Sequence, residues 1–560
     1  MKTLETILPT GARLLVLFLA AVLAATVPAF AQQEAEVDTQ FSEVIDVRVI
    51  NLEVVVEDDG VRVHGLQPQD FELTVDGREV PIEYFTEVVG GVATARQGST
   101  ADATVPAQVP GEVVATSYLL FIDDHFSISR DRDRVLDHLI EQLPNIRPSD
   151  QMAVVAYDGK KVDMLSNWSS SVNALTRTLR EAKDRPADGL LRLAERQGFR
   201  TDQELITEGL SFGNWFYESS LGERQITAEE EYWVQRTEAR VRRAVMAATA
   251  TLRSFAQPRG RKVMLLLSGG WPSDPVSYIV ADPNRVSTNR VLRGNELVGP
   301  LAKTANLLGY TIYPVDVPGL EPDGVDVSVP TTAAGDFRRL NSESQERENQ
   351  FTLHQLASET GGKAMVNSLR DVALERVVAD LQSYYWIGFT PSWKGDDSVH
   401  DVKVKVRDRK YKIRSRKNFS DLSRTTEVNM MVESALRFGG APGGIPLAAE
   451  VGRGKKAGWG KRQVPLRIAI PLDALTFLPT ADGFEARAEL RVAVLDESGG
   501  TADIPVIPIE LTSQRPPRQG EALPYETAIK MRNQAHDLVV SIYDNASGRI
   551  LSAKLEVKKN

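Results

Sequence analysis

The chain has 560 residues, of which 42% are hydrophobic and 25% are charged, a length sufficient for roughly three or four globular domains. Its formal net charge is −10, which argues against a nucleic-acid-binding protein that relies on a globally basic surface. The sequence contains no cysteine, which excludes disulfides, thiolate metal sites and cysteine nucleophiles.

The first 31 residues predict a signal peptide. Lys2 and Arg13 precede an apolar segment at residues 14–27, and a small-x-small cleavage pattern ends at Ala31. A membrane anchor is the alternative, but an apolar helix of this length spans only ~21 Å, whereas the hydrocarbon core of a bilayer is ~30 Å thick. We therefore expect an exported protein, periplasmic or secreted, that keeps no transmembrane segment after cleavage.

Residues 40–89 predict a small N-terminal β module. Apolar and polar residues alternate through the strands expected at 45–56 and 71–75, and Asp-Asp-Gly and Asp-Gly turns follow them. A linker rich in glycine, alanine, serine and threonine is expected at residues 90–113.

Residues 114–383 predict an α/β domain. Buried strands alternate with amphipathic helices, which indicates a mainly parallel, doubly wound sheet. Two insertions interrupt this pattern: a helical one at 185–258 and a polar loop at 321–350. We expect the long helix of the first insertion to cover or extend the face formed by the loops that follow the strands.

Beyond residue 383 the apolar period returns to two. Strands are expected at residues 384–420, either as an extension of the N-terminal module or as a separate unit. Residues 428–560 predict a C-terminal β-sandwich-like domain, because apolar side chains alternate clearly along 484–494 and in several later segments.

Polar residues directly follow the first buried strand of the α/β region: Asp123, Asp124, His125, Ser127 and Ser129. Either serine hydroxyl would suit the N-cap of the next helix, where it satisfies a free amide. Oxygen ligands at a strand end also suit a hard divalent cation. Catalysis is the third interpretation, although neighbouring residues of an extended segment point in opposite directions and do not converge by themselves.

The order of three stretches resembles the VWFA-related Acidobacterial domain family, whose members are exported proteins built around a von Willebrand factor type A domain. The stretches are the β-rich segment at 44–85, LLFIDDHFSIS at 119–129, and the segment at 353–391 that contains ETGGKA and YYWIGFTP. The resemblance covers residues 41–419. It implies a Rossmann-like von Willebrand A domain flanked by β-sandwich-like modules.

Intact A domains hold a divalent cation with a D-x-S-x-S segment, a threonine from a later loop and an aspartate after the fourth strand. In this chain Asp123 and Ser127 match, but His125 replaces the first serine and Gly269 stands at the position of the second aspartate. The resemblance therefore implies a degenerate metal-ion-dependent adhesion site that binds Mg²⁺, Mn²⁺ or Ca²⁺ weakly, if at all. Its candidate ligands are Asp123, Ser127 and Asp274, with Asp124 as a substitute.

The sequence predicts a non-enzymatic protein-binding or adhesion-type module. Trp168 and Trp271 follow strand ends, where open α/β sheets bind ligands, so His125 and these two tryptophans are the candidate partner contacts. The partner is expected to be a protein of unknown identity. One alternative is a metal-dependent hydrolase centred on Asp123, Asp124 and His125, although no HExxH motif, Walker loop or GxSxG elbow is present. The other is an envelope scaffold that acts through the C-terminal β domain.

Overall fold

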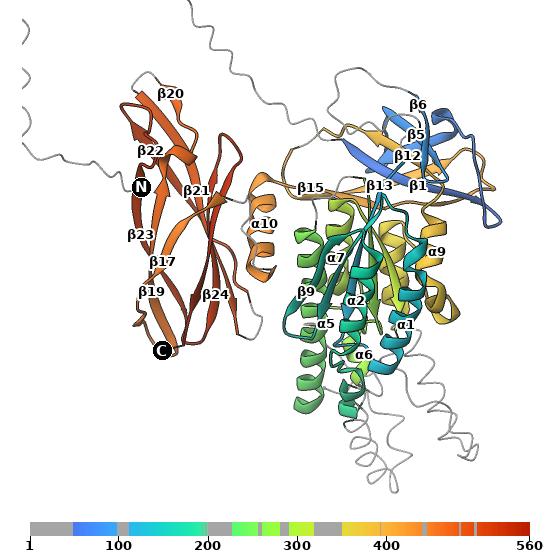
Figure 1. Ribbon diagram of the computed structural model, residues 1–560, viewed down its shortest axis with the longest axis horizontal. Coiled ribbons are helices and arrows are strands. Elements are labelled where there is room, and N and C mark those ends of the chain that lie inside the picture. The colour runs from blue at the N-terminus through green and yellow to red at the C-terminus, as the bar shows by residue number, and fades with distance from the viewer. Residues whose placement is uncertain are drawn as a thin grey trace, which may run out of the picture. The chain divides into compact units, whose positions relative to one another are not determined.

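The computed structural model (Figure 1) describes residues 49–97, 111, 113–192, 194–196, 199, 227–255, 260–280, 291–317, 350–392, 394–438, 445–480, 483–497 and 501–559. The expected signal peptide, nearly all of the loop insertion at 321–350 and most of the later part of the linker lie outside these residues. Within the described part of the chain, no helix combines the length and the apolar character that a membrane crossing requires.

Two antiparallel sheets form the first β module. Across the first sheet lie β14 (Lys412–Arg414), β1 (Ile50–Asp58), β12 (Tyr384–Phe389), β5 (Tyr84–Val89) and β6 (Val92–Gln97), with β2 (Val61–Arg62) beside β1. Across the second lie β15 (Asn418–Asp421), β13 (Ser398–Val406), β3 (Phe71–Val75) and β4 (Arg78–Glu79). Strands from both ends of the α/β region therefore share each sheet, and their inner faces meet in one apolar core.

Strand β6 occupies the start of the segment expected as linker. It pairs with β5 through a two-residue turn at Gly90 and Gly91, whose φ angles are 60° and 76°. Positive φ at both central residues matches the twist of a hairpin, and glycine adopts it without steric cost. The small residues at this position thus make a hairpin.

A five-stranded sheet forms the centre of the α/β domain. Across it lie β11 (Tyr310–Asp316), β10 (Arg261–Ser268), β7 (Thr116–Asp123), β8 (Gln151–Tyr157) and β9 (Val162–Ser169). The first four strands are parallel, and β9 forms the expected antiparallel hairpin with β8. In chain order the strands run 5-4-1-2-3, so the direction of winding reverses between β7 and β10.

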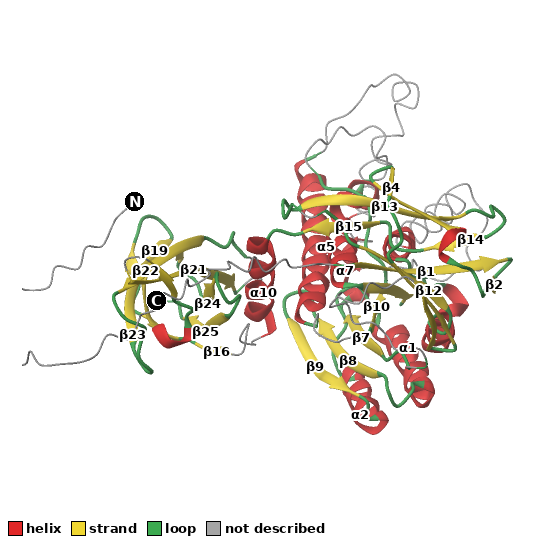
Figure 2. Ribbon diagram, turned by 90° about the horizontal axis from the view of Figure 1, so that it is seen from above, coloured by secondary structure: helices red, strands yellow, loops and turns green. Residues whose placement is uncertain are grey.

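Helices cover both faces of this sheet, as Figure 2 shows for α5 and α7 on one side and α1 and α2 on the other. The first face carries α5 (Ala228–Ser254), α6 (Pro275–Ile279) and α7 (Asn295–Leu308), and the second carries α1 (Ser129–Gln142), α2 (Val172–Lys183) and α9 (Ala373–Asp380). Because successive strand residues face opposite layers, Phe121 packs in one core and Ile122 in the other. This explains the continuous apolar runs.

The long helix α5 packs on the sheet, whereas the sequence suggested a helix that covers or extends the loop face. Its N-terminus is held by a capping box: the Thr227 hydroxyl accepts from the Glu230 amide at 3.2 Å, and the Glu230 carboxylate accepts from the Thr227 amide at 2.9 Å. Its apolar stripe is buried in the core of the first face, as Val234, Val241, Val245, Ala248 and Leu252. α5 is therefore a structural helix of the α/β domain.

The turn after the helix at residues 350–360 needs two glycines for different reasons. Gly361 has a φ of 79°, the left-handed conformation expected at a helix C-terminus. A Cβ atom on Gly362 would lie 1.9 Å from the carbonyl oxygen of Ile312 in β11. The chain thus returns to the sheet edge through a position where only glycine fits.

A second sandwich forms residues 445–557. One sheet holds β16 (Ile445–Pro446), β25 (Ile550–Val557), β24 (His536–Asp544), β21 (Gly483–Asp496) and β20 (Leu478–Thr480), with β22 (Val506–Ser513) on β21. The other holds β17 (Ala448–Val451), β19 (Lys461–Pro471) and β18 (Lys455–Lys456), with β23 (Ala522–Arg532) on β19. The alternation along 484–494 buries Ala486, Ala488, Leu490 and Val492 in the core between them.

A helix, α10 (Arg424–Phe438), precedes the second sandwich in a region predicted to be all β. Its residues Val428, Val432, Ala435 and Leu436 are buried against β21 and β24. Their spacing is that of one helical face, so the signal was present in the sequence and the period was misassigned.

Replacing Gly362 with alanine is expected to destabilise the α/β domain by ~3 kcal/mol, because a methyl group cannot share space with the Ile312 carbonyl without moving backbone. Gly299→Ala is the matched control. Its Cβ would meet the side chain of Asn295, whose oxygen is nearest at 2.6 Å, and no backbone atom is among its three nearest neighbours; alanine also favours the helix. Urea unfolding of both variants would measure the difference, and equal stabilities would contradict the packing described for the sheet edge.

Candidate functional site

The polar cluster lies at the point where the strand order reverses. Asp123 ends β7 and Ser268 ends β10, and these two strands are parallel neighbours. β8 lies on the other side of β7 and β11 on the other side of β10, so the strand order reverses between them. In open α/β sheets the crevice outside the carboxyl ends of such a strand pair is the usual ligand-binding position. The topology therefore places the candidate residues where a site is expected.

The Asp123 carboxylate is fully buried and accepts hydrogen bonds from four donors. Oδ2 accepts from the Ser268 hydroxyl and from the indole Nε1–H of Trp271, both at 2.8 Å. Oδ1 accepts from the backbone amides of His125 and Phe126, both at 3.2 Å. A carboxylate offers about four lone-pair sites, so these donors leave none for a further ligand.

The four donors to Asp123 are neutral groups, which stabilise the anion by their dipoles and bring no countercharge. Burial raises the pKa of the Asp123 carboxyl to about 6, and the hydrogen bonds from Trp271 and Ser268 act in the opposite direction. The group is thus mostly ionised at neutral pH and becomes protonated in mild acid.

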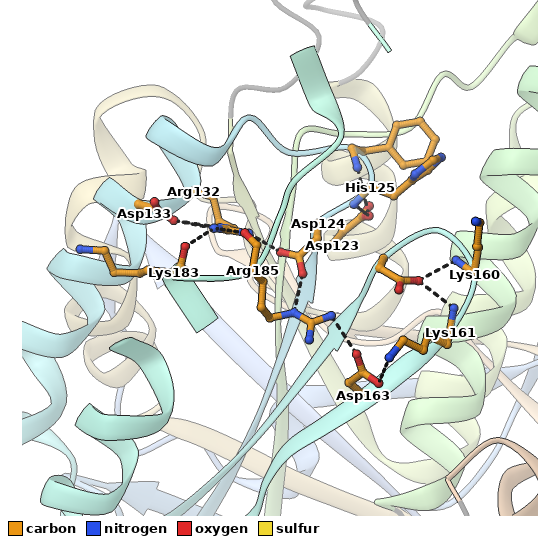
Figure 3. Close-up of polar contacts among 12 residues, drawn as sticks. Asp123, Asp124, His125, Arg132, Asp133, Lys160, Lys161, Asp163, Lys183 and Arg185 are labelled. Carbon is orange, nitrogen blue, oxygen red and sulfur yellow. Dashed lines mark hydrogen bonds and ion pairs between the residues drawn. The ribbon is translucent and has the colours of Figure 1, made fainter. Parts of the chain in front are cut away.

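The neighbouring Asp124 belongs to a separate network on the other side of the strand end (Figure 3). Its carboxylate accepts from Nη1 of Arg132 at 2.7 Å and from Nε of Arg185 at 2.8 Å. Arg132 is itself fully buried, and it also donates to Asp133 and to the carbonyl oxygens of Lys183 and Arg185. Burial raises the pKa of Asp124, while the bonds from the two arginines lower it. The two carboxylates do not converge on a common point.

His125 and Ser127 are both buried next to this network. The His125 Nδ1 lies 3.2 Å from the Asp188 carboxylate, while its Nε2 has no hydrogen-bond partner among the described residues. Burial lowers the pKa of His125 to about 4, so the ring is neutral at physiological pH. The Ser127 hydroxyl likewise has no partner within the described ranges.

Neither serine caps the helix that follows, which corrects that expectation. The N-cap of α1 is Ile128, which makes no side-chain cap hydrogen bond, and Ser129 is already the first helical residue. The Ile128 carbonyl accepts the first helical bonds, from Asp131 at 3.2 Å and from Arg132 at 2.9 Å. The preceding turn is instead closed by Asp123, which takes the two backbone amides that follow it.

The residues suggested by the A-domain pattern do not fit a divalent cation bound to Asp123. Asp274, the third candidate ligand, caps α6 by accepting from the Val276 amide at 3.0 Å and pairs with Arg293 at 3.2 Å. In the described part of the chain, no group of three or more histidine, aspartate or glutamate side chains is placed to hold a metal ion. The oxygens of Asp123 are already occupied by protein donors.

The three candidate partner contacts differ in position. Trp271 has no exposed surface, because its ring lies in the core and its indole bonds to Asp123. Trp168 is partly buried and packs edge-on against Phe255, with ring centroids 5.4 Å apart. His125 is largely buried. None of the three therefore presents a full side chain to a partner in this structure.

Exposed apolar residues that sequence reasoning missed lie beside the cluster. Leu190 and Leu191 are 63% and 52% exposed. The residues before them are tied to the loop after β7, because the Asp188 amide donates to the Asp124 carbonyl at 2.8 Å and the Gly189 amide to the Ser127 carbonyl at 3.0 Å. The only local sequence feature that could have indicated this exposed pair is two leucines directly after Asp188-Gly189, outside the apolar period of a helix or strand.

A further exposed aromatic residue adjoins the same region. Phe351 is 55% exposed at the start of the helix at residues 350–360. The next residue, Thr352, is buried, and its hydroxyl accepts from the Trp271 amide at 3.2 Å. Exposed apolar side chains thus lie on two segments far apart in sequence, one bonded to the loop after β7 and the other to Trp271.

No protein-family model and no curated protein matches the chain. Structural similarity is found to the vWF domain of the type V pili tip protein Mfa5 from Porphyromonas gingivalis, with 12% identity, coverage of 42% of this chain and 96% of that chain, and a TM-score of 0.19. The PilB minor pilin from Streptococcus sanguinis shows 10% identity, coverages of 60% and 77%, and a TM-score of 0.24.

The pilus adhesin SpaC from Lactobacillus rhamnosus GG matches at 7% identity over 88% of this chain and 62% of that chain, with a TM-score of 0.24. A putative β-galactosidase from Bacteroides fragilis and two β-glucuronidase structures from Bacteroides uniformis also match, but the chain spans only 16%, 13% and 19% of their lengths. At such TM-scores these similarities carry no argument about fold or function.

Asp123→Asn is expected to remove one component of the pH dependence of stability. The folded pKa of about 6 lies above the value of 3.8 for the free side chain, so the stabilising contribution of Asp123 is present below pH 3.8 and lost as the pH rises through 6. The loss amounts to about 3 kcal/mol, and asparagine does not titrate.

Urea unfolding of both proteins across this pH range would test the expectation. The stability advantage of the wild type over Asp123→Asn should shrink as the pH rises. Comparison with the variant is needed because His125, whose pKa is lowered, contributes a slope of opposite sign. An advantage that is constant or grows with pH would contradict the burial of an ionisable Asp123.

Proposed function

We propose that the chain is an exported protein-binding module whose α/β domain is von Willebrand A-like and contacts its partner at the carboxyl edge of the sheet. The 5-4-1-2-3 strand order, with helices on both faces and the polar cluster at the switch point, supports this assignment. Partner binding proceeds without a divalent cation on Asp123, since neutral protein donors occupy that carboxylate.

The observation that carries the proposal is the exposure of large apolar side chains at this edge. Leu190 and Leu191 are exposed to solvent. Backbone hydrogen bonds of the two preceding residues attach their segment to the loop after β7. Apolar side chains held rigidly in water favour a contact that covers them, because their burial is favourable and little conformational entropy is lost. Phe351 adds an aromatic anchor of the kind enriched in protein interfaces.

In this account the Asp123–Trp271 hydrogen bond has a positioning role. It fixes the loop after β10 against the end of β7, and through Thr352 it places the segment that carries Phe351. Asp123 and Asp124 are both buried and bonded to separate partners, so neither is placed to activate water for hydrolysis. We therefore do not propose the hydrolase alternative.

Site-specific photo-cross-linking would test the proposed surface. A benzophenone amino acid at position 190 or 351, in the mature chain incubated with envelope fractions of the source cells, is expected to give the same cross-linked protein from both positions. The yield should be unchanged in EDTA, because no cation bridges the two proteins.

The same probe at position 399 is the control. Val399 is an exposed apolar residue of β13, which belongs to a different sheet from the one that carries the switch point. Equal cross-linking from all three positions would indicate non-specific contact. A product that appears only with added Mg²⁺, or no product from positions 190 and 351, would contradict the proposal.

A further inference from the structure

A hairpin of the C-terminal sandwich carries an almost fully exposed tryptophan, flanked by glycines, at its tip. The hairpin joins β18 to β19 through residues 457–460, and the Ala457 amide donates to the Lys461 carbonyl at 2.9 Å. Gly458 and Gly460 have positive φ angles of 97° and 64°, and no atom lies within 4 Å of where their Cβ atoms would be. Between them Trp459 is 98% exposed, so the tip is convex and open.

The exposure of Trp459 exceeds that of every other large apolar residue in the described part of the chain; the next is Val61 at 69%. Tryptophan has a large apolar surface that most folds bury at least in part. At 98% exposure the Trp459 side chain packs against almost nothing among the described residues, so it contributes little to their stability. Folding of the described residues therefore does not explain the position of Trp459.

Unpaired cations surround the tip on the outer face of the sheet. Lys461 of β19 lies directly opposite Arg532 of β23, and Gln463 lies between Lys455 of β18 and Lys530 of β23. All four cationic residues are exposed, and none forms an ion pair with any described residue. Like charges directly opposite each other destabilise a sheet, so folding alone does not favour this arrangement.

The buried Arg462 holds two further lysines, Lys558 and Lys559, at this end of the sandwich. Its guanidinium donates to the carbonyl oxygens of Lys558 at 2.5 Å and of Gln534 at 2.6 Å, which ties the end of the chain to the hairpin. Lys558 and Lys559 are exposed. In sequence, no acidic residue occurs between Glu450 and Asp473, although the whole chain has a net charge of −10.

We propose that this tip docks on an anionic lipid bilayer, with Trp459 at the level of the headgroups and the surrounding lysine and arginine side chains on the lipid phosphates. Tryptophan is enriched at membrane–water interfaces, where its ring is apolar and its N–H remains hydrated. Clustered cations near a bilayer that contains acidic lipids are attracted to its surface potential.

The shape of the tip favours a lipid surface over a peptide or a sugar chain. Recognition of those ligands uses a concave pocket or groove with several convergent side chains. The residues on either side of Trp459 are glycines, which provide no walls for a pocket. A single projecting ring with flanking cations suits a flat, deformable surface.

Vesicle co-sedimentation of the mature full-length chain would test the proposal, with vesicles of phosphatidylcholine alone or mixed with phosphatidylglycerol. Binding is expected only to the mixed vesicles and is expected to weaken in high salt. Lys455→Gln/Lys461→Gln should bind about 25-fold more weakly, at about fivefold for each charge removed near the surface. Trp459→Ala should also weaken binding and should abolish tryptophan quenching by brominated lipid.

The double substitution Lys303→Gln/Lys363→Gln is the matched control. It removes two exposed lysines of the α/β domain and changes the net charge equally, so vesicle binding should be unchanged. Absence of binding to the mixed vesicles would overturn the proposal, as would equal loss in the control. Binding that Trp459→Ala leaves intact and that soluble dextran sulfate competes away would show plain polyanion attraction in place of membrane docking.

Discussion

The candidate site is organised around the fully buried carboxylate of Asp123, at the carboxyl end of the middle strand of the α/β sheet. Removing Asp123 from water is unfavourable unless its oxygens are bonded, and the chain brings four donors from three places to satisfy them. The loop after β7, the end of β10 and the Trp271 loop are thereby held together. The geometry of this edge therefore follows from the requirement to satisfy one charge.

Because side chains alternate along a strand, the adjacent residues Asp123 and Asp124 point to opposite sides and bond to different partners. Asp123 turns toward β10 and Trp271, while Asp124 turns toward Arg132 of α1 and Arg185 after α2. One carboxylate thus organises each side of the strand end. Neutral donors satisfy Asp123, and two arginines satisfy Asp124.

Much of the α/β fold could be predicted from the sequence, because its buried strands and amphipathic helices have distinct periods. The β8–β9 hairpin, the stripe of α5 and the glycine turn after residue 360 all follow from local pattern. The site was less predictable because its bonds are not local. Trp271 donates to Asp123 across 148 residues of sequence, and no nearby residue indicates that a tryptophan would bond to this carboxylate. Helix α10 was missed for a different reason: its apolar spacing is helical, but most of its residues were included in the predicted C-terminal β domain.

Protein donors occupy Asp123, so we expect the folded chain to need no divalent cation there. The first measurement is the melting temperature of the mature protein in EDTA, compared with that in millimolar Mg²⁺, Mn²⁺ or Ca²⁺. A cation that bound only the folded state would stabilise it by about 2.7 kcal/mol at a hundredfold excess over its Kd. We expect the same melting temperature in every condition. A metal-dependent rise that Asp123→Ala abolishes would contradict it.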